Sequence, residues 1–194
     1  MIDLDDLQHA LVRHTPTIAD PGSAVAAILH GNQTPHLLFI ERARVEGDPW
    51  SGDIAFPGGR VESQDAGLQE AAERETLEEI GLDLSREQYL GRLDDLVTQT
   101  LGVQVAAFVY KAKTTGEFRL NHEVARAFWQ PLSILADPKR HRFHFFTNRG
   151  FAHRLPAIDL LGPGRPLLWG ITYRFVAQLM HLSGQPLPAL NDQP

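Results

Sequence analysis

The sequence predicts an α/β protein in which a mixed β-sheet is covered by helices. Short apolar runs have the length of buried strands, and they are mixed with a few segments of helical periodicity. The 194 residues contain no internal repeat and no Ser/Gly-rich linker, and this length suits one domain. We therefore expect a single domain over residues 1–184. Residues 185–194 contain three prolines and predict a flexible tail.

The N-terminal part of the chain predicts a helix and then a hairpin. Residues 3–14 carry leucines at helical spacing. Residues 23–30 and 35–43 are apolar runs around a Gly-Asn-Gln-Thr turn, so they predict two paired strands. After a polar loop over 44–53, residues 54–59 predict a short strand that is stopped by a proline and two glycines.

A second helix is predicted between Asp65 and Ile80. Asp65 can cap its first turn, and Gly81 supplies its C-terminal stop. Apolar residues lie on two sides of this helix, one strip including Ala66 and Leu77. This pattern predicts a helix packed on both sides, with its glutamates along a cleft.

The C-terminal part predicts further strands and a closing helix. Residues 89–97, 102–112 and 140–147 have strand character, and residues 131–135 form a short helical turn. An amphipathic helix follows over 169–182. The residues predicted to face the core are Ile171, Phe175, Leu179 and Leu182.

Composition excludes several classes of protein. With 43% apolar and 22% charged residues, the chain has the profile of a soluble globular protein. It has no apolar run near the roughly 20 residues that a membrane-spanning helix needs. The N-terminus has acidic residues where a secretory signal has basic ones, so we expect a cytoplasmic protein. Because cysteine is absent, any metal must be held by oxygen or imidazole ligands.

Negative charge is concentrated in one segment. The net charge of −6 opposes nonspecific binding to nucleic acid. Residues 59–80 hold seven acids and two bases, a balance of −5. Such crowding is repulsive unless the acids are solvated or meet cations.

Glu75, Glu78 and Glu79 share one face of the predicted helix, because their spacing is three and four residues. Oxygen-only ligands favour Mg²⁺ or Mn²⁺. The alternative is a solvated acidic face with an Arg74–Glu78 ion pair.

From Gly59 the chain reads GRVESQDAGLQEAAERETLEEIGL, which resembles the Nudix hydrolase signature. That signature is Gly, five residues, Glu, seven residues, and then Arg-Glu-apolar-x-Glu-Glu-x-Gly-apolar. The chain departs from it at Asp65, in the eight residues before Arg74, and at Thr76 in the apolar position. Asp65 can equally be a helix cap. Residues 59–82, which carry this signature, are called the box below. The AFPGG before the box and the later EVARAFWQPL also resemble this family.

The resemblance implies a Nudix-type α/β/α sandwich with a mixed sheet. It also implies a pyrophosphohydrolase that uses Mg²⁺ or Mn²⁺ and water to cleave a nucleoside diphosphate linked to another moiety. The implied catalytic residues are Arg74, Glu75, Glu78, Glu79 and Glu123. The implied metal ligands are Gly59, through its carbonyl, and Glu75, Glu78, Glu79 and Glu123. The expected substrate-binding residues are Arg42, Arg60 and Trp50.

The roles of several individual residues have alternatives. Glu123 is either a metal ligand or the general base, against a solvated position in a loop. Arg74 is expected to orient the glutamates by pairing with them. Trp50 lies in a polar loop and is the candidate exposed aromatic residue, whereas Trp129 is expected in the core.

The segment before the box resembles the coenzyme A pyrophosphatase branch through Arg42, Ala43, Gly52 and FPGG. Asp48 stands where that branch has an arginine. Coenzyme A is therefore one candidate substrate, beside dinucleotides, nucleotide sugars and modified nucleoside triphosphates. A noncatalytic ligand-binding module is the alternative class. The partner is a small molecule in each case, with a homodimer left open.

Overall fold

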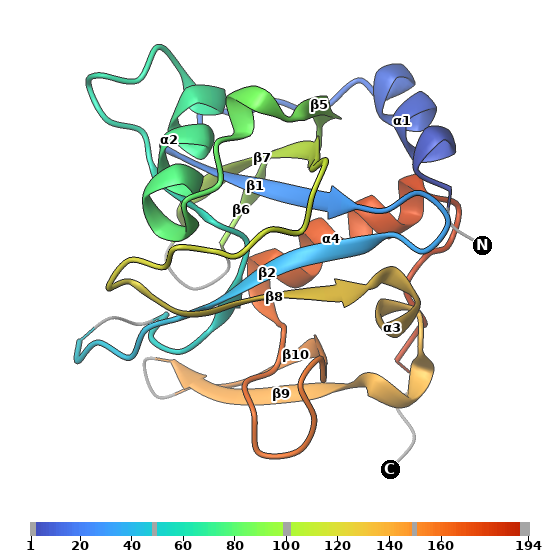
Figure 1. The fold of residues 1–194 in the computed structure, drawn as a ribbon. Helices are drawn as coiled ribbons and strands as arrows, with labels where there is room; N and C mark the ends of the chain where they lie inside the picture. Colours follow the sequence, from blue (N-terminus) through green and yellow to red (C-terminus); the bar gives the residue numbers. More distant parts are fainter. Residues whose placement is uncertain (1–2, 48–49, 99–101, 149–150, 191–194) are drawn as a thin grey trace.

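A mixed sheet forms the centre of the molecule in the computed structural model (Figure 1). The structure describes residues 3–47, 50–98, 102–148 and 151–190. The strands of the main sheet are β1 (Ser23–His30), β2 (His36–Arg42), β3 (Ile54–Ala55), β4 (Gly58–Arg60), β5 (Gln88–Arg92), β6 (Leu96–Val97), β7 (Gln104–Lys111) and β8 (Val124–Pro131). The helices are α1 (Leu4–Arg13), α2 (Leu68–Ile80), α3 (Leu132–Leu135) and α4 (Gly170–Leu182). Two single turns are η1 (Leu84–Arg86) and η2 (Pro138–Arg140).

β1 and β7 form the parallel centre of the sheet. They pair from Ser23 with Val105 to Leu29 with Lys111. Both strands are buried along most of their length, as expected for parallel strands covered on both faces. The predicted hairpin of β1 and β2 is confirmed, and β8 extends the sheet antiparallel beyond β2.

Helices cover both faces, which confirms the α/β/α sandwich. On one face, α2 packs through Ala72 and Ile80 against β1, β2 and β7. On the other face, α1 and α4 bury Leu7 and Phe175 in a second core cluster. The predicted inward residues of α4 are confirmed, because Phe175 and Leu179 are buried and Ile171 and Leu182 pack against that cluster. None of the described helices is long and apolar enough to cross a membrane.

Segment 54–60 forms two strands, where the sequence predicted one. β3 pairs with β2, and β4 pairs with β1. Pro57 lies between them, and its carbonyl accepts a hydrogen bond from the Ala26 N–H at 2.9 Å. The chain thus moves from one strand partner to the other at the proline.

The predicted limits of α2 were wrong at its N-terminus. The helix begins at Leu68, and the cap position is Gly67, which has no side chain to bond the helix. Asp65 therefore does not cap the helix. The prediction of packing on two sides was also wrong, because Leu77 is 47% exposed and α2 buries one face only within the described residues. The stop at Gly81 is confirmed, with φ of 73°.

One other strand prediction needs correction, and two strands were missed. Segment 89–97 splits into β5 and β6, with the turn at Leu93 buried between them. β8 was not predicted as a strand. The strand predicted over 140–147 is present as β9 (His141–Asn148), but its partner β10 (Phe151–Ile158) was not predicted. The two form a separate hairpin at the lower edge of Figure 1.

Candidate active site

The buried face of α2 carries the first acidic side chain of the site. Thr76 occupies the position where the signature has an apolar residue, and it is fully buried. Its hydroxyl donates a hydrogen bond to the Ala72 carbonyl at 2.7 Å. A threonine satisfied in this way can replace an aliphatic residue in the packing. Glu79 lies three positions beyond Thr76 on this buried face and is only 2% exposed.

Glu79 is held against the strand that precedes the helix. The Gly58 N–H donates to its Oε2 at 2.9 Å. The pKa of Glu79 is raised to about 8, mainly by burial and also by the negative charges of Glu75 and Glu123, whereas the Gly58 hydrogen bond and the charge of Arg42 act to lower it. A carboxylate in this position gains from any cation brought to it.

Glu75 lies one turn earlier, against the backbone of Gly59. A Cβ added at Gly59 would collide with the carboxylate of Glu75 in its present position, so the glycine leaves room for this close approach. Burial raises the pKa of Glu75, and Arg74 opposes that shift while Glu78 and Glu123 add to it. The carboxylate of Glu75 therefore lies against the backbone of Gly59.

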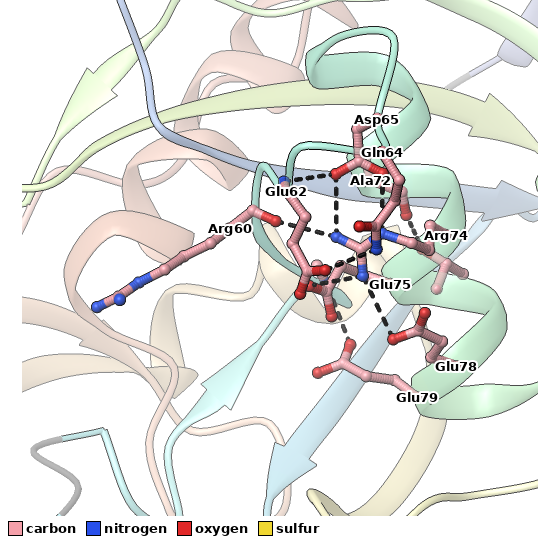
Figure 2. Close-up of polar contacts among 11 residues, drawn as sticks. Arg60, Glu62, Gln64, Asp65, Ala72, Arg74, Glu75, Glu78 and Glu79 are labelled. Carbon is pink, nitrogen blue, oxygen red and sulfur yellow. Dashed lines mark hydrogen bonds and ion pairs between the residues drawn. The ribbon is translucent and has the colours of Figure 1, made fainter.

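Arg74 connects the acids of the box (Figure 2). Its guanidinium bonds both oxygens of Asp65, at 2.9 and 3.1 Å, and the Arg60 carbonyl at 3.0 Å. It also pairs with Glu75 at 3.2 Å and with Glu78 at 3.3 Å. The pairing expected for Arg74 is confirmed.

Asp65 is the principal partner of Arg74. Its side chain is almost inaccessible, and the hydrogen bonds from Arg74 and from the Glu62 N–H hold its pKa below the ordinary value. The same carboxylate raises the pKa of Arg74, which stays protonated. Asp65 thus anchors the arginine and does not point to the glutamates, a role that the sequence pattern did not indicate.

Glu78 differs from the other two glutamates. Its side chain is 54% exposed and forms an ion pair with Arg74. The predicted ion pair between Arg74 and Glu78 is therefore present, whereas Glu75 and Glu79 turn inward.

Glu123 reaches the site from the loop before β8. The loop is tied to the end of α2, because the Asn121 N–H donates to the Glu79 carbonyl at 3.0 Å. The Asn121 side chain accepts from the Glu123 N–H at 2.8 Å, and the Glu123 carbonyl accepts from the Ala43 N–H at 2.7 Å. The Glu123 side chain is exposed, and its charge acts on both Glu75 and Glu79. The structure therefore brings Glu123 to the two inward glutamates.

The expected substrate-binding residues have three different surroundings. Arg42 ends β2, and its charge offsets that of Glu79. The Arg60 side chain extends away from the glutamates (Figure 2). Trp50 is half-buried and lines a hollow with Trp169. Trp129 packs against Phe118 and His30, as expected for a core residue. Asp48 lies outside the described residues.

The side chains present fit a hard divalent cation. Among the residues that the structure describes, no group of three or more His, Asp or Glu side chains is close enough together to hold a metal ion. Mg²⁺, however, needs only one or two carboxylates beside waters and substrate phosphates. Glu75 against Gly59, with Glu79 beside it, offers an oxygen-only donor set of that size.

The fold and the site define a class: an α/β/α sandwich in which a loop–helix–loop lays acidic side chains against the edge of a mixed sheet. Residues 20–150 match the NUDIX domain. The chain belongs to the Nudix family.

Similar proteins agree with this assignment. A probable nudix hydrolase of Schizosaccharomyces pombe, C6G9.05, is 32% identical over 151 residues, covering 77% of this chain and 51% of that protein. The mitochondrial coenzyme A diphosphatase NUDT8 of Homo sapiens is 31% identical over 141 residues, covering 71% of this chain and 58% of its own. The chain thus spans about half the length of these curated relatives.

A solved structure supports the fold. The MutT/nudix family protein from Enterococcus faecalis superposes with a TM-score of 0.58 and 16% identity, covering 92% of this chain and 68% of that one.

Proposed function

We propose that the chain hydrolyses a phosphate–phosphate bond in a nucleoside diphosphate linked to another moiety, with Mg²⁺ or Mn²⁺ as cofactor. The observation that carries the proposal is Glu79, a buried carboxylate held by the Gly58 N–H beside Glu75 and Glu123. Buried like charges are costly unless a cation offsets them. Nudix hydrolases act on phosphorus-containing acid anhydrides and generally use divalent metals, which agrees with this reading.

The residues of this chain take separate roles in the proposal. Glu75, Glu79 and the Gly59 carbonyl would hold the cation, with Glu78 as a further ligand available to it in place of its ion pair with Arg74. The cation would acidify a water and offset charge on the phosphoryl oxygens. Arg74, anchored by Asp65, keeps Glu75 in place. The Glu123 carboxylate accepts the proton of the attacking water, with a ligand role as its alternative.

Coenzyme A is the first candidate substrate. The mitochondrial coenzyme A diphosphatase of Homo sapiens is among the relatives, and the segment around Arg42 and FPGG resembles that branch. Arg42 ends β2 at the mouth of the site, where a cation can meet a substrate phosphate. Dinucleotides, nucleotide sugars and modified nucleoside triphosphates are the competing substrates.

The test is a panel of these diphosphates with millimolar Mg²⁺ or Mn²⁺, with the products identified by mass spectrometry. Cleavage of coenzyme A should release 4′-phosphopantetheine and adenosine 3′,5′-bisphosphate. Glu79→Gln is the inactive reference, and Leu77→Gln, on the exposed side of the same helix, is the matched control. If no diphosphate is cleaved with either metal, the proposal is wrong.

A further inference from the structure

We propose that the hollow between Trp50 and Trp169 is the subsite for the nucleobase of the substrate, which stacks on these indole rings. The inference rests on the proposed function, because it names the part of a nucleoside diphosphate that the chain recognises outside the phosphates. The proposed subsite gives a role to aromatic residues of the β9–β10 hairpin and of the start of α4. These residues take no part in the proposed phosphate chemistry.

The hollow is lined mainly by flat and apolar groups. Trp50 comes from the 44–53 loop, Leu155 from β10, and Trp169 with Ile171 from the start of α4. Arg174 stands at its edge, with its guanidinium bonded to the Val97 carbonyl at 2.7 Å. Indole faces bind nucleobases by stacking, which tolerates different bases because each has a π face.

Trp169 is held in place by other aromatic rings. The rings of His144 and Phe146 pack against it, with centroids at 4.6 and 4.9 Å. His153 stacks on Phe146 at 5.0 Å, which extends this aromatic cluster across both strands of the hairpin. Rigid aromatic groups lose little conformational entropy on binding, so a ring fixed in this way is suited to contact a ligand.

Asp53 links the two tryptophans to each other. Its side chain accepts a hydrogen bond from the Trp169 indole N–H at 3.1 Å. Its backbone N–H donates to the Trp50 carbonyl at 3.1 Å and closes a turn of the loop. Through these bonds the loop and the start of α4 form one structural unit around the hollow.

The same aspartate connects the hollow to the phosphate site. The Asp53 carbonyl accepts from the Arg42 N–H at 2.9 Å, and the charge of Arg42 acts on Glu79. The Ala43 N–H, one residue on, bonds the Glu123 carbonyl. In the proposed complex, a nucleotide with its diphosphate at Glu75 and Glu79 extends its ribose and base along this connection to the hollow.

The lining favours a base over the flexible arm of a substrate such as coenzyme A. A pantetheine arm carries two amides, which need hydrogen-bond partners once they leave water. Arg174 offers donors only, and the Thr98 hydroxyl already accepts from the Val103 N–H at 2.9 Å, so these side chains offer few acceptors for the amide N–H groups of the arm. A stacked base keeps its polar edge toward solvent, so it does not need such partners.

Tryptophan fluorescence offers a test that does not depend on catalysis. The chain has three tryptophans, and Trp129 lies elsewhere, between His30 and Phe118. In a Trp129→Phe variant, only Trp50 and Trp169 emit. Titration with adenosine 5′-diphosphate in EDTA should quench this emission, whereas 4′-phosphopantetheine should leave it unchanged. Quenching by 4′-phosphopantetheine alone would overturn the assignment to a base.

Substitution of Trp50 provides a second test of the subsite. Trp50→Ala should weaken adenosine 5′-diphosphate binding about 10- to 100-fold, in line with stacking energies of about 1–3 kcal/mol per base. Trp50→Phe should retain affinity within about threefold, because a ring remains. Thermal melts of each variant check folding. If Trp50→Ala does not fold, the quenching experiment on the Trp129→Phe protein still tests the inference.

The hydrolysis assay separates failure of this inference from failure of the proposed function. If the wild-type protein cleaves a diphosphate and Trp50→Ala leaves both its KM and nucleotide binding unchanged, the inference is wrong and the proposed function stands. If the wild-type protein cleaves none of the panel, the proposed function fails. A rise in KM for Trp50→Ala, restored by Trp50→Phe, supports both.

Discussion

The N–H of Gly58 donates a hydrogen bond of 2.9 Å to the carboxylate of Glu79, which lies 21 positions later in the chain. This bond fixes the last turn of α2 to β4. Gly58 has φ of 147°, and a Cβ there would collide with the Ala24 carbonyl and with Val25 of β1. The close packing that buries Glu79 therefore depends on a glycine at this position.

Gly58→Ala should destabilise the fold, because the added methyl group meets backbone atoms that cannot move aside. Overpacking of this kind costs about 1–3 kcal/mol, to which the strained φ adds. We expect a lower midpoint in urea unfolding than for the wild-type chain. Gly67→Ala is the matched control, since a Cβ at Gly67 has no heavy atom within 4 Å. Equal midpoints for the two variants would contradict the packing described.

Glu79→Gln should lower kcat by at least about 100-fold while the fold persists, because it removes a charge that holds the cation of the transition state. The amide oxygen of glutamine can still accept the Gly58 N–H, so circular dichroism and melting should show an intact protein. Leu77→Gln, at an exposed position two residues earlier, should keep wild-type turnover. Near-normal kcat of Glu79→Gln at saturating Mg²⁺ would remove α2 from the mechanism.

Divalent cations should raise the melting temperature in the absence of substrate. The folded chain brings Glu75 and Glu79 together under burial that raises the pKa of both, so a cation that binds there stabilises the native state. Calorimetry with millimolar Mg²⁺ or Mn²⁺ should show the shift, and Glu79→Gln should reduce it. An unchanged melting temperature for the wild-type chain would count against a preformed metal site.

The sequence predicted the elements whose signals are local. The leucines of α1, the turn between β1 and β2, and the glycine that ends α2 all act within a few residues, and the structure has them where expected. The start of α2 could not be read in the same way. Asp65 has the chemistry of a helix cap, but the chain uses it to bind Arg74, nine positions later, and this competition depends on tertiary structure.

The missed strands have weak patterns of their own. β10 contains Arg154 and Pro156, and it becomes a strand because every residue from Phe151 to Ile158 finds a partner in β9. β8 buries only Val124 and Phe128 and exposes Ala125 and Arg126 between them, as is typical of a strand at the edge of a sheet. Nonlocal pairing decides such segments.

For the candidate site, the box predicted the residue types but not their different surroundings. Glu75, Glu78 and Glu79 look equivalent in the sequence, yet the first touches the Gly59 backbone, the second is exposed and the third is buried. The approach of Glu123 depends on the bonds of Asn121, which joins the loop to the end of α2. No spacing rule within the sequence relates these positions.

His144 should make the stability of the fold depend on pH. Burial beside Trp169 lowers the pKa of His144 from its ordinary value of 6.5. As the pH falls below 6.5, the unfolded chain takes up this proton before the folded chain does, so the free energy of unfolding falls until the folded pKa is passed. His144→Phe should remove this part of the loss in urea unfolding between pH 7 and roughly pH 5. An unchanged pH dependence in the variant would contradict the assignment to His144.

Glu123→Gln should distinguish a general base from a metal ligand. A base contributes roughly 100- to 10,000-fold, so loss of Glu123 should lower kcat within that range while KM and metal affinity change little. The exposed side chain beside Glu75 and Glu79 can approach a water from the open side of the site. Glu117→Gln, on the segment between β7 and β8, is a matched control for loss of an exposed carboxylate. We expect activity of the Glu123 variant to rise with pH, as hydroxide replaces the missing base, and not to recover at high Mn²⁺. Recovery with Mn²⁺ would make Glu123 a ligand, and wild-type rates would remove it from the mechanism.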